Sequence, residues 1–540
     1  MINKRVIICF ILSLFMATTV IINFDGMFVS NVNGQSLEKE SKGSIVFKDP
    51  ELKAELVVSG LEFPTSLAFI EKDDFLILEK ETGLVKRVTD RKISEPLLQL
   101  NVNGKDERGL LGIDISKKKY SAGFEIIYVY LSYVECESKE ACKNKVVRYE
   151  LDTANNKLIY PKNIFSVESF PDDSHIGGNL KVGPDDNVYV TVGDFHGTEF
   201  TPIYETQAQN FENGVSPDGR SGILRVSPDG DPISNGILGE EYPINLYFAY
   251  GIRNSFGIDF DPLTGHLWDT ENGPDYGDEI NLVEPGFNSG SVKIFGQFNS
   301  NKKYQFHNMG QSKIEKGPFG LVTFNGKGKY SEPELSWQDT VAPTAVTFLD
   351  SNALGNNYRY DMFVSNANGG KIYHFDLSQD RKQLVLKDVL ADKVVDSNSE
   401  EDSITFAEGF TLITDLEMNP YDGSLYVVSL DNRGSGEGSV YKIVSTSPPD
   451  PIKDPASPKN TIKFPSGIES RQGEQLKNLQ DQNTTNNKTK DNNEFTICNK
   501  LNSFVNILSD TWMNKKIEDE QVMYLVPQVK ELMFEARCID

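Results

Sequence analysis

The chain has 540 residues, 38% hydrophobic and 10% aromatic, and its 54 Lys and Arg against 79 Asp and Glu give a formal charge of −25. This aromatic content excludes wholesale disorder and indicates a globular protein with a large core. The negative charge, with no basic stripe to offset it, disfavours nucleic acid and anionic lipid as partners, whereas abundant carboxylates suit a hard cation such as calcium.

The first 34 residues are typical of an export signal. Lys4 and Arg5 precede an apolar run at 6–24, and polar and small residues follow it. We predict that 1–34 is a signal peptide or an N-terminal anchor, because the apolar run is also long enough to stay in a membrane as a helix. No later run of the sequence approaches that length. The rest of the chain is therefore expected to be extracellular or at the cell surface, with membrane contact only through an uncleaved anchor.

The four cysteines after the apolar run fall into two pairs, Cys136 with Cys142 and Cys498 with Cys538. An even number in an oxidising compartment predicts two disulfides. The alternative is four unpaired small apolar residues. Both pairs lie in polar or terminal segments, where a covalent link is more useful than a thiol, so we favour the disulfides.

Residues 50–445 are predicted to form an all-β domain, a six-bladed β-propeller. Short runs of Val, Ile, Leu, Phe and Tyr are separated by Gly, Asn, Asp and Pro, which is typical of strands joined by turns. One sequence pattern, an apolar strand followed by a turn and a second strand, occurs in six copies, as expected of propeller blades. The rival is a tandem of β-sandwiches, which the lack of linkers between repeats disfavours. The copies lie at 66–78, 111–131, 180–190, 257–268, 345–364 and 416–427.

The composition changes after the repeats. Residues 446–494 are first rich in Pro and then in Asn and Gln, and we predict a linker there. The sequons at Asn483 and Asn487 are acceptors if the host glycosylates exported proteins. Residues 495–540 have helical spacing, which predicts a small helical hairpin appended to the propeller and closed by the Cys498–Cys538 disulfide.

His175 is the first candidate for chemistry. It precedes a Gly-Gly pair at the entry to an inner strand of the third repeat, where backbones pass close to the propeller axis. An imidazole suits a general base, and Asp194, at the end of the next strand, would come back beside it and orient the ring. The plain alternative is a histidine that only caps a turn. This segment alone does not separate the two readings.

A second cluster follows in the next repeat. Arg253 opens this repeat as His175 opens the one before it, and its guanidinium could bind a carboxylate at two points. The Gly273-Pro274 turn, with Asp278 and Glu279 after it, is rich in oxygen and sharply bent. This combination fits a calcium site built from main-chain carbonyls and carboxylates.

These motifs occur in the order seen in the glucose/sorbosone (aldose sugar) dehydrogenase family of soluble quinoproteins, which the chain resembles over about residues 50–445. The matching segments are Gly-Leu-Glu-Phe-Pro at 60–64, Arg-Gly-Leu-Leu-Gly at 108–112, His-Ile-Gly-Gly-Asn-Leu at 175–180, Gly-Ile-Arg-Asn at 251–254, Glu-Asn-Gly-Pro at 271–274 and Asp-Glu-Ile-Asn at 278–281. The resemblance implies a six-bladed propeller that binds pyrroloquinoline quinone (PQQ) and calcium near its axis and oxidises the C1 hydroxyl of an aldose to a lactone.

The resemblance also implies roles for individual residues. His175 would take the hydroxyl proton while hydride passes to the quinone, and Asp194 would hold the imidazole. Arg253 and Asn254 would contact PQQ. The carbonyls of Gly273 and Pro274, in the turn followed by Asp278 and Glu279, would hold calcium.

The sequence departs from the family at two places around the cofactor. Asn368 stands nearest to the position of a cofactor-binding lysine, and Lys371 is displaced from it. In the sixth repeat Leu412 and Thr414 replace two arginines, although Asp415 remains. The cationic cradle for a quinone with three carboxylates is therefore depleted, and burying such an anion without cationic partners is costly.

Three functions remain open at this point. We favour an exported quinoprotein that oxidises a sugar or another polyol and passes electrons to an unknown acceptor. The alternative is a propeller of the same family without the cofactor that binds a ligand, glycan or protein through its central face, because one scaffold hosts both uses. A calcium-dependent hydrolase or lactonase is less favoured, since it would need several carboxylate or amide side chains converging on an axial metal.

Overall fold

The computed structural model describes residues 44–120, 125–138, 141–170, 174–195, 205–297, 320–430 and 437–446. The predicted signal or anchor at 1–34, the linker beyond residue 446 and the hairpin at 495–540 with its Cys498–Cys538 disulfide lie outside these ranges. Among the described residues, no helix has the length and apolar character needed to cross a membrane.

The described strands form six sheets, which are given below with the innermost strand first. The first has β3 (Pro64–Glu71), β4 (Asp74–Glu79), β5 (Leu84–Thr89) and β6 (Lys92–Ile93), with β7 (Leu98–Gln99) also on β5; the second has β8 (Leu110–Lys119), β9 (Glu125–Cys136), β10 (Cys142–Asp152) and β11 (Lys157–Ser169). The third has β12 (Gly177–Val182), β13 (Val188–Val192), β14 (Gly222–Val226), β15 (Tyr247–Tyr250), β19 (Phe287–Asn288) and β20 (Lys329–Tyr330).

The remaining three sheets complete the set. The fourth has β16 (Ser255–Phe260), β17 (Leu267–Glu271), β18 (Asp278–Val283), β21 (Leu335–Trp337) and β25 (Val394–Val395); the fifth has β22 (Pro343–Phe348), β23 (Met362–Asn366), β24 (Ile372–Phe375), β26 (Thr405–Glu408) and β1 (Val46–Phe47). The sixth has β27 (Leu412–Met418), β28 (Leu425–Leu430), β29 (Glu437–Ser445) and β2 (Leu52–Glu62). The described helices are α1 (Asn398–Ile404) and the 3₁₀ turns η2 (Gln207–Gln209), η3 (Ile244–Leu246), η4 (Asn356–Tyr358) and η5 (Asp388–Asp392).

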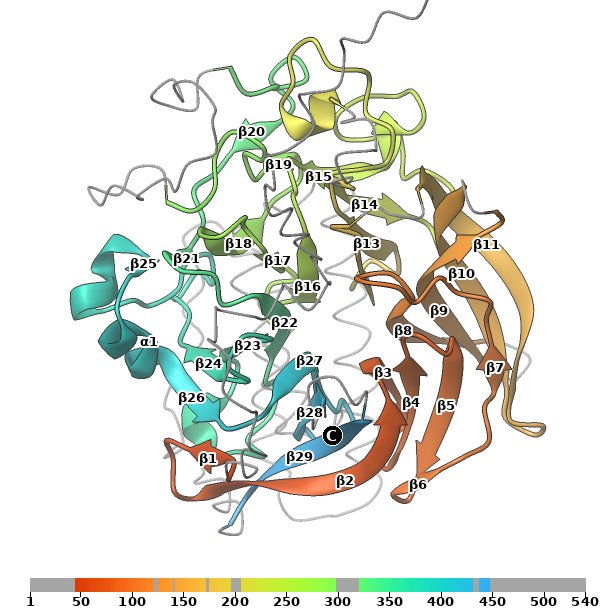
Figure 1. Ribbon diagram of the computed structural model, residues 1–540, viewed down its shortest axis with the longest axis vertical. Helices are drawn as coiled ribbons and strands as arrows, with labels where there is room; N and C mark the ends of the chain where they lie inside the picture. Colours follow the sequence, from red (N-terminus) through yellow and green to blue (C-terminus); the bar gives the residue numbers. More distant parts are fainter. Residues whose placement is uncertain are drawn as a thin grey trace, which may run out of the picture. The chain divides into compact units, whose positions relative to one another are not determined.

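The sheets follow one another around a ring (Figure 1). Each innermost strand contacts the innermost strand of the next sheet in the order β3, β8, β12, β16, β22, β27, and β27 contacts β3 again. The sixth sheet joins both ends of the described chain, because β2 pairs antiparallel with β29. The prediction of an all-β, propeller-like fold is confirmed.

The core lies between neighbouring sheets. Every residue of β4 and β28 is buried, since both faces of these middle strands pack against an adjacent sheet. Strand β10 shows the alternative pattern, in which buried and half-exposed residues alternate over most of its length. The turns between these runs carry the Asp, Asn and Gly residues that the sequence places there.

The hairpin of β9 and β10 carries the first predicted disulfide. Cys136 and Cys142 are direct partners in the antiparallel register and form a disulfide, with 3.9 Å between their Cα atoms. This prediction is confirmed. The bridge lies at the end of two of the longest described strands.

The far ends of the inner strands carry an axial charge cluster, which we define as Asp114, Lys181, Asp259, Asp415 and Glu417. The Lys181 ammonium lies 2.5 Å from Glu417 Oε2. Asp114 accepts the Val182 N–H of the next inner strand at 2.7 Å. Burial alone would lower the pKa of Lys181, but the four carboxylates raise it. The cluster therefore binds four inner strands together electrostatically, at the end of the ring away from the loops that precede these strands.

Candidate active site

His175 lies in the loop that leads into β12, in a backbone conformation that glycine usually adopts. Its φ is +55°, and Gly177 and Gly178 after it also have positive φ values of 67° and 97°. The backbone at Gly193 passes so close to His175 that only glycine fits there. A Cβ atom at Gly193 would lie 1.9 Å from the His175 carbonyl oxygen. The His-x-Gly-Gly segment and the Gly-Asp pair after β13 therefore let two backbones meet at this point.

Asp194 contacts the His175 ring. Its Oδ1 lies 2.8 Å from His175 Nδ1, and the two side chains are only 7% and 11% exposed. The Asp194 main chain is fixed as well, since its N–H donates to the Arg253 carbonyl at 2.9 Å. The structure thus places the predicted base and its predicted orienting carboxylate together, because they flank the open end of the antiparallel β12–β13 hairpin.

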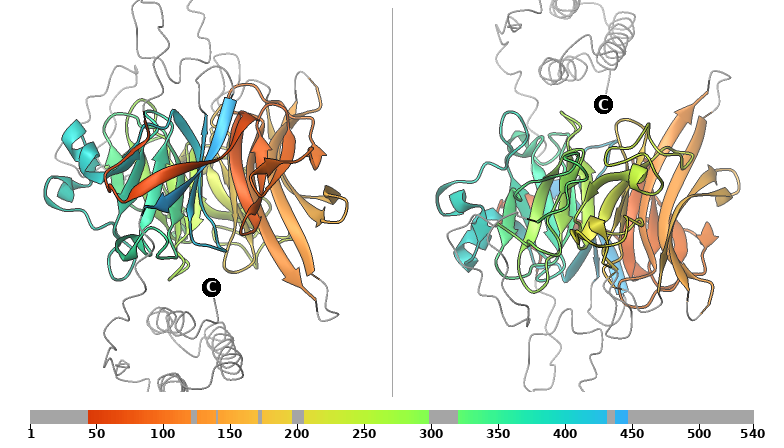
Figure 2. Two further views of the ribbon diagram at one scale, coloured as in Figure 1. Left: turned by 90° about the horizontal axis from the view of Figure 1, so that it is seen from below. Right: turned by 90° about the horizontal axis from the view of Figure 1, so that it is seen from above.

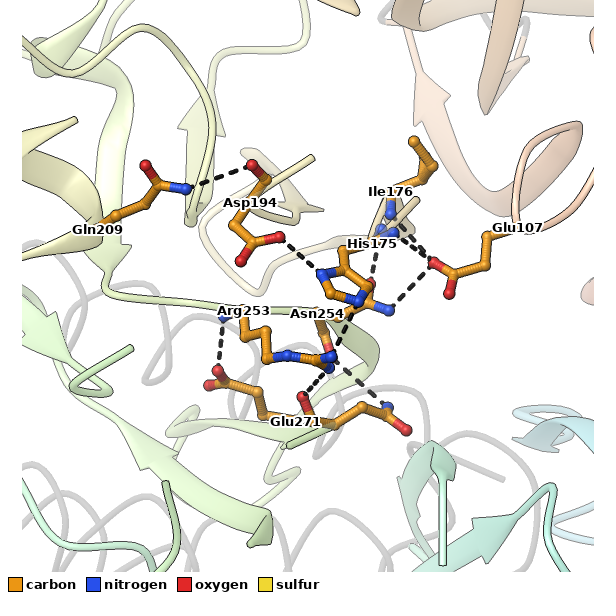
Figure 3. Close-up of polar contacts among 10 residues, drawn as sticks. Glu107, His175, Ile176, Asp194, Gln209, Arg253, Asn254 and Glu271 are labelled. Atoms are coloured by element: carbon orange, nitrogen blue, oxygen red, sulfur yellow. Dashed lines mark hydrogen bonds and ion pairs between the residues drawn. The ribbon is translucent and has the colours of Figure 1, made fainter. Parts of the chain in front are cut away.

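Arg253 completes the set on the other side of the imidazole (Figure 3). Its Nη2 lies 2.9 Å from His175 Nε2. A guanidinium group has donors only, so Nε2 accepts, and we assign the ring proton to Nδ1, facing Asp194. Arg253 Nη1 also donates to the Asn272 carbonyl at 2.9 Å, and the Arg253 N–H donates to Glu271 Oε1 at 2.6 Å. His175 is therefore held as a neutral imidazole whose Nε2 lone pair faces a cation.

The side-chain amide of Asn254 forms hydrogen bonds within the protein. It is fully buried, its Oδ1 accepts the Gly177 N–H at 3.1 Å, and its Nδ2 donates to Glu107 Oε2 at 3.2 Å. Its carbonyl accepts the Asn272 N–H at 2.8 Å. The side chain thus connects three loops beneath His175.

Glu107 is the functional residue that sequence reasoning missed. It lies in the loop before β8 and is 8% exposed, and its Oε2 accepts the His175 N–H at 2.7 Å. Its position in the sequence could have identified it. Like His175 and Arg253, it is a polar residue just before an inner strand. Its neighbour Arg108 forms an ion pair with Asp106 at 2.7 Å.

Asp278 acts on the Gly-Pro turn through hydrogen bonds. Its Oδ1 accepts the Gly273 N–H at 2.8 Å, and its Oδ2 accepts the N–H groups of Val341 and Ala342 at 2.7 and 2.8 Å. Burial raises the pKa of Asp278, while these hydrogen bonds oppose the rise. The carboxylate therefore joins two loops and has few lone pairs left for a metal ion.

Both carboxylate oxygens of Glu279 also accept hydrogen bonds from the protein. Its Oε1 accepts the Gly296 N–H at 2.6 Å, and its Oε2 accepts from Asn281 Nδ2 at 3.1 Å and from Ser289 Oγ at 3.2 Å. Burial first, and then the charge of Glu271, raise its pKa well above the ordinary value. Glu271 lies opposite it in the β17–β18 register, and burial raises the pKa of Glu271 to about 7.

The turn itself offers oxygen ligands of another kind. No described residue donates a hydrogen bond to the main-chain carbonyl of Gly273 or Pro274. Main-chain carbonyls are ordinary calcium ligands. Of the four residues predicted to bind metal, these two are the ones with oxygen atoms available.

The positions that depart from the family pattern are tied into the fold. Asn368 is half-buried, donates its N–H to the Val341 carbonyl at 3.1 Å and accepts from Asn366 Nδ2 at 2.8 Å. Lys371 forms an ion pair with Glu401 at 2.9 Å. Thr414 Oγ1 donates to the Pro64 carbonyl at 2.9 Å. The cation in contact with the imidazole is Arg253.

Comparison with known proteins places this geometry in a family. Residues 61–435 match the family model for glucose/sorbosone dehydrogenase. Quinoprotein glucose dehydrogenase B of Acinetobacter calcoaceticus is 27% identical over 272 residues, which are 46% of this chain and 54% of that protein. The chain thus spans about half the length of that relative.

Two further proteins are similar over a larger share of their length. Aldose sugar dehydrogenase YliI of Escherichia coli (strain K12) is 21% identical over 388 residues, which are 71% of this chain and 91% of that protein. The PQQ-bound aldose sugar dehydrogenase of Streptomyces coelicolor has the same fold, with a TM-score of 0.51 and 20% identity over 73% of this chain and 99% of that chain. The matched family model covers more than half of the sequence, and the chain belongs to the glucose/sorbosone dehydrogenase family.

Proposed function

We propose that this protein is an exported oxidoreductase that oxidises the C1 hydroxyl of an aldose to a lactone, with PQQ as hydride acceptor and His175 as general base. The observation that carries the proposal is the contact of His175 Nδ1 with Asp194 at 2.8 Å, with Nε2 left as the acceptor side of the ring. We interpret the six sheets as six blades around this site. Sugar or a related polyol is the substrate class, and electrons leave to an acceptor that is not identified.

The described residues fit PQQ and calcium at three points. Arg253 supplies a guanidinium for one carboxylate, the carbonyls of Gly273 and Pro274 supply calcium ligands, and His175 supplies the base. Asn368 would add a neutral contact. When bound, the calcium-polarised quinone supplies the two-electron acceptor that the protein side chains lack.

The protein's own part of the reaction is to move one proton. His175 Nε2 accepts the proton of the sugar hydroxyl, because Asp194 keeps the other ring proton on Nδ1 and stabilises the imidazolium that forms. Arg253 Nη2 donates to the same lone pair, so the hydroxyl must displace this contact. Arg253 stays anchored meanwhile through Asn272 and Glu271.

The charges around His175 favour one other function. Glu107 and Asp194 contact His175, and Glu271 accepts the Arg253 main-chain N–H, so the site holds three carboxylates and one guanidinium. This excess of negative charge suits a neutral or cationic ligand better than a tricarboxylate. A propeller without the quinone that binds a ligand, glycan or protein on this face is therefore the second candidate.

Titration of the calcium-loaded full chain with PQQ, followed by a panel of aldoses, tests the proposal. We expect stoichiometric binding and sugar-dependent bleaching of the quinone, with turnover lowered about 1,000-fold in His175→Asn because a general base is removed. His374→Asn is the matched control, since His374 also pairs with an aspartate, Asp361, at 2.8 Å but in another sheet. Absence of PQQ binding at micromolar concentration would reject the dehydrogenase and favour the binding module.

A further inference from the structure

One oxygen of Glu107 collects three hydrogen bonds from two other sheets. Its Oε2 accepts the His175 N–H at 2.7 Å, the Ile176 N–H at 3.3 Å and Asn254 Nδ2 at 3.2 Å. Figure 3 shows these three donors converging on the carboxylate. The side chain is only 8% exposed, so water competes little for these contacts.

The first two donors, the N–H groups of His175 and Ile176, lie on either side of the His175 Cα atom, and the backbone of His175 has an unusual geometry. His175 has φ +55°, which residues other than glycine rarely adopt. Successive N–H groups around a left-handed residue point to the same side of the chain and form a concave anion site. The Glu107 carboxylate fills this concavity, and its charge offsets the strain of holding His175 there.

The third donor extends the support to the next residues. Asn254 Nδ2 donates to Glu107, and Asn254 Oδ1 accepts the Gly177 N–H at 3.1 Å. The main chain from His175 to Gly177 is thus held by Glu107 directly and through Asn254. The contacts of the imidazole with Asp194 and Arg253 depend on this placement, because a rotation at φ of His175 would swing the whole ring.

We propose that Glu107 is a positioning residue for His175: its carboxylate fixes the left-handed main chain that directs the imidazole between Asp194 and Arg253. This role rests on the proposed function of His175 as a base for its effect on catalysis, but not for its effect on the ring. The recorded contacts of Glu107 reach the main chain of His175 and not its imidazole.

The first experiment reads the ring directly. The full chain has five histidines, so labelling them with ¹⁵N gives a small set of ring signals. We expect His175 to show a downfield Nδ1–H signal from its bond to Asp194, and we expect Glu107→Ala to lose it. Glu107→Gln keeps an oxygen acceptor for the two N–H groups and is expected to retain the signal at a shifted position.

The matched control is Glu400→Ala. Glu400 is also a buried glutamate, 6% exposed, and its Oε2 accepts the Asp396 N–H at 2.8 Å near α1. This variant loses a comparable hydrogen bond away from His175, so its ring signals should match the wild type. An unchanged His175 signal in Glu107→Ala, or equal changes in both variants, would overturn the proposal.

The second experiment is a double-mutant cycle on turnover. Glu107→Ala should lower kcat about 100-fold, the size expected when a reacting group is displaced by about 1 Å, and leave KM nearly unchanged. In a His175→Asn background the same change should cost about twofold or less, since Glu107 acts through His175. Equal losses in both backgrounds would show a general structural effect and reject the role. If the wild type oxidises no sugar, the proposed function fails while the ring signals still decide the role of Glu107.

Discussion

The two ends of the inner strands place one cation among several carboxylates, yet they do so to different effect. At the His175 end, the Arg253 guanidinium contacts the imidazole that Asp194 also contacts, and Glu107 and Glu271 accept the main-chain N–H groups of His175 and Arg253. At the other end, the axial charge cluster surrounds the single ammonium of Lys181 with four carboxylates. Figure 2 shows the ring of sheets from two opposite sides, edge-on. The same strands carry both arrangements, since β12 follows His175 and contains Lys181.

The difference lies in what the carboxylates hold. In the axial charge cluster, Asp114 and Asp415 accept N–H groups of neighbouring inner strands, Val182 and Leu67, at 2.7 and 2.9 Å, so their bonds join sheets. At the His175 end Asp194 contacts the imidazole, while Glu107 and Glu271 hold the main chain of His175 and Arg253. A lysine with a raised pKa keeps its proton, whereas a neutral imidazole can accept one. The imidazole, and not the charge pattern, therefore makes one end suited to proton transfer.

Removing the cation of the axial charge cluster should have the largest effect, and this effect should be on stability. Lys181→Met leaves four carboxylates without their ammonium, and an uncompensated buried charge costs about 3 kcal/mol. We expect the free energy of unfolding in urea to fall by this amount at pH 8, with the His175 ring signals unchanged. A variant as stable as the wild type would show that the carboxylates hold the sheets without Lys181.

Adding a cation at the other end should change affinity instead of stability. Asn368→Lys restores a charge where the family has a lysine, and one charge-assisted hydrogen bond contributes about 1.5 kcal/mol. PQQ should bind about tenfold more tightly in a fluorescence or absorbance titration, while the melting temperature stays close to the wild type. Asn366→Lys is not a suitable control because Asn366 is buried, so Asn368→Gln serves that purpose. Equal affinity of the lysine and glutamine variants would count against Asn368 as a cofactor contact.

The axial charge cluster should also make the stability of the protein depend on pH. Burial first, and then the charges of Asp415, Asp259 and Asp114, raise the pKa of Glu417 to about 8 despite the opposing effect of Lys181. A carboxyl group whose pKa is higher in the folded state binds its proton more tightly there, so stability is lost as the pH rises from about 5 through 8. Glu417→Gln should reduce this loss by at least about 1.4 kcal/mol, the equivalent of one pKa unit, measured as unfolding free energy at pH 5 and pH 9. An identical pH profile would mean that another group titrates.

Much of the fold could be predicted because its signals are local. Apolar runs between turn residues define strands such as β28, and two cysteines that face each other across one hairpin define the Cys136–Cys142 bridge. The meeting of His175 and Asp194 was also accessible, since one hairpin connects them. These contacts depend on the spacing within single repeats.

The contacts that could not be predicted join different sheets. Glu107 and His175 are 68 positions apart in the sequence, and Arg253 and His175 are 78 apart. Nothing in the local pattern shows that the Arg253 side chain turns to the imidazole or that Asn254 turns to Glu107. Likewise, the acidity of Asp278 suggested a metal ligand, and the sequence did not show that its donors would come from Gly273 and from the loop before β22. Side-chain direction at the ends of inner strands is decided by tertiary packing.

The pairing of β2 with β29 has a consequence for biogenesis. Leu52 and Ser445 are register partners, so the ring can close only when nearly the whole described chain is present. A chain released before residue 437 would leave β2 and β28 as unpaired edges that attract other strands. Such late closure makes folding slow compared with local contacts. A chain that still lacks β29 is therefore expected to be prone to pairing with other copies until this last strand has been made.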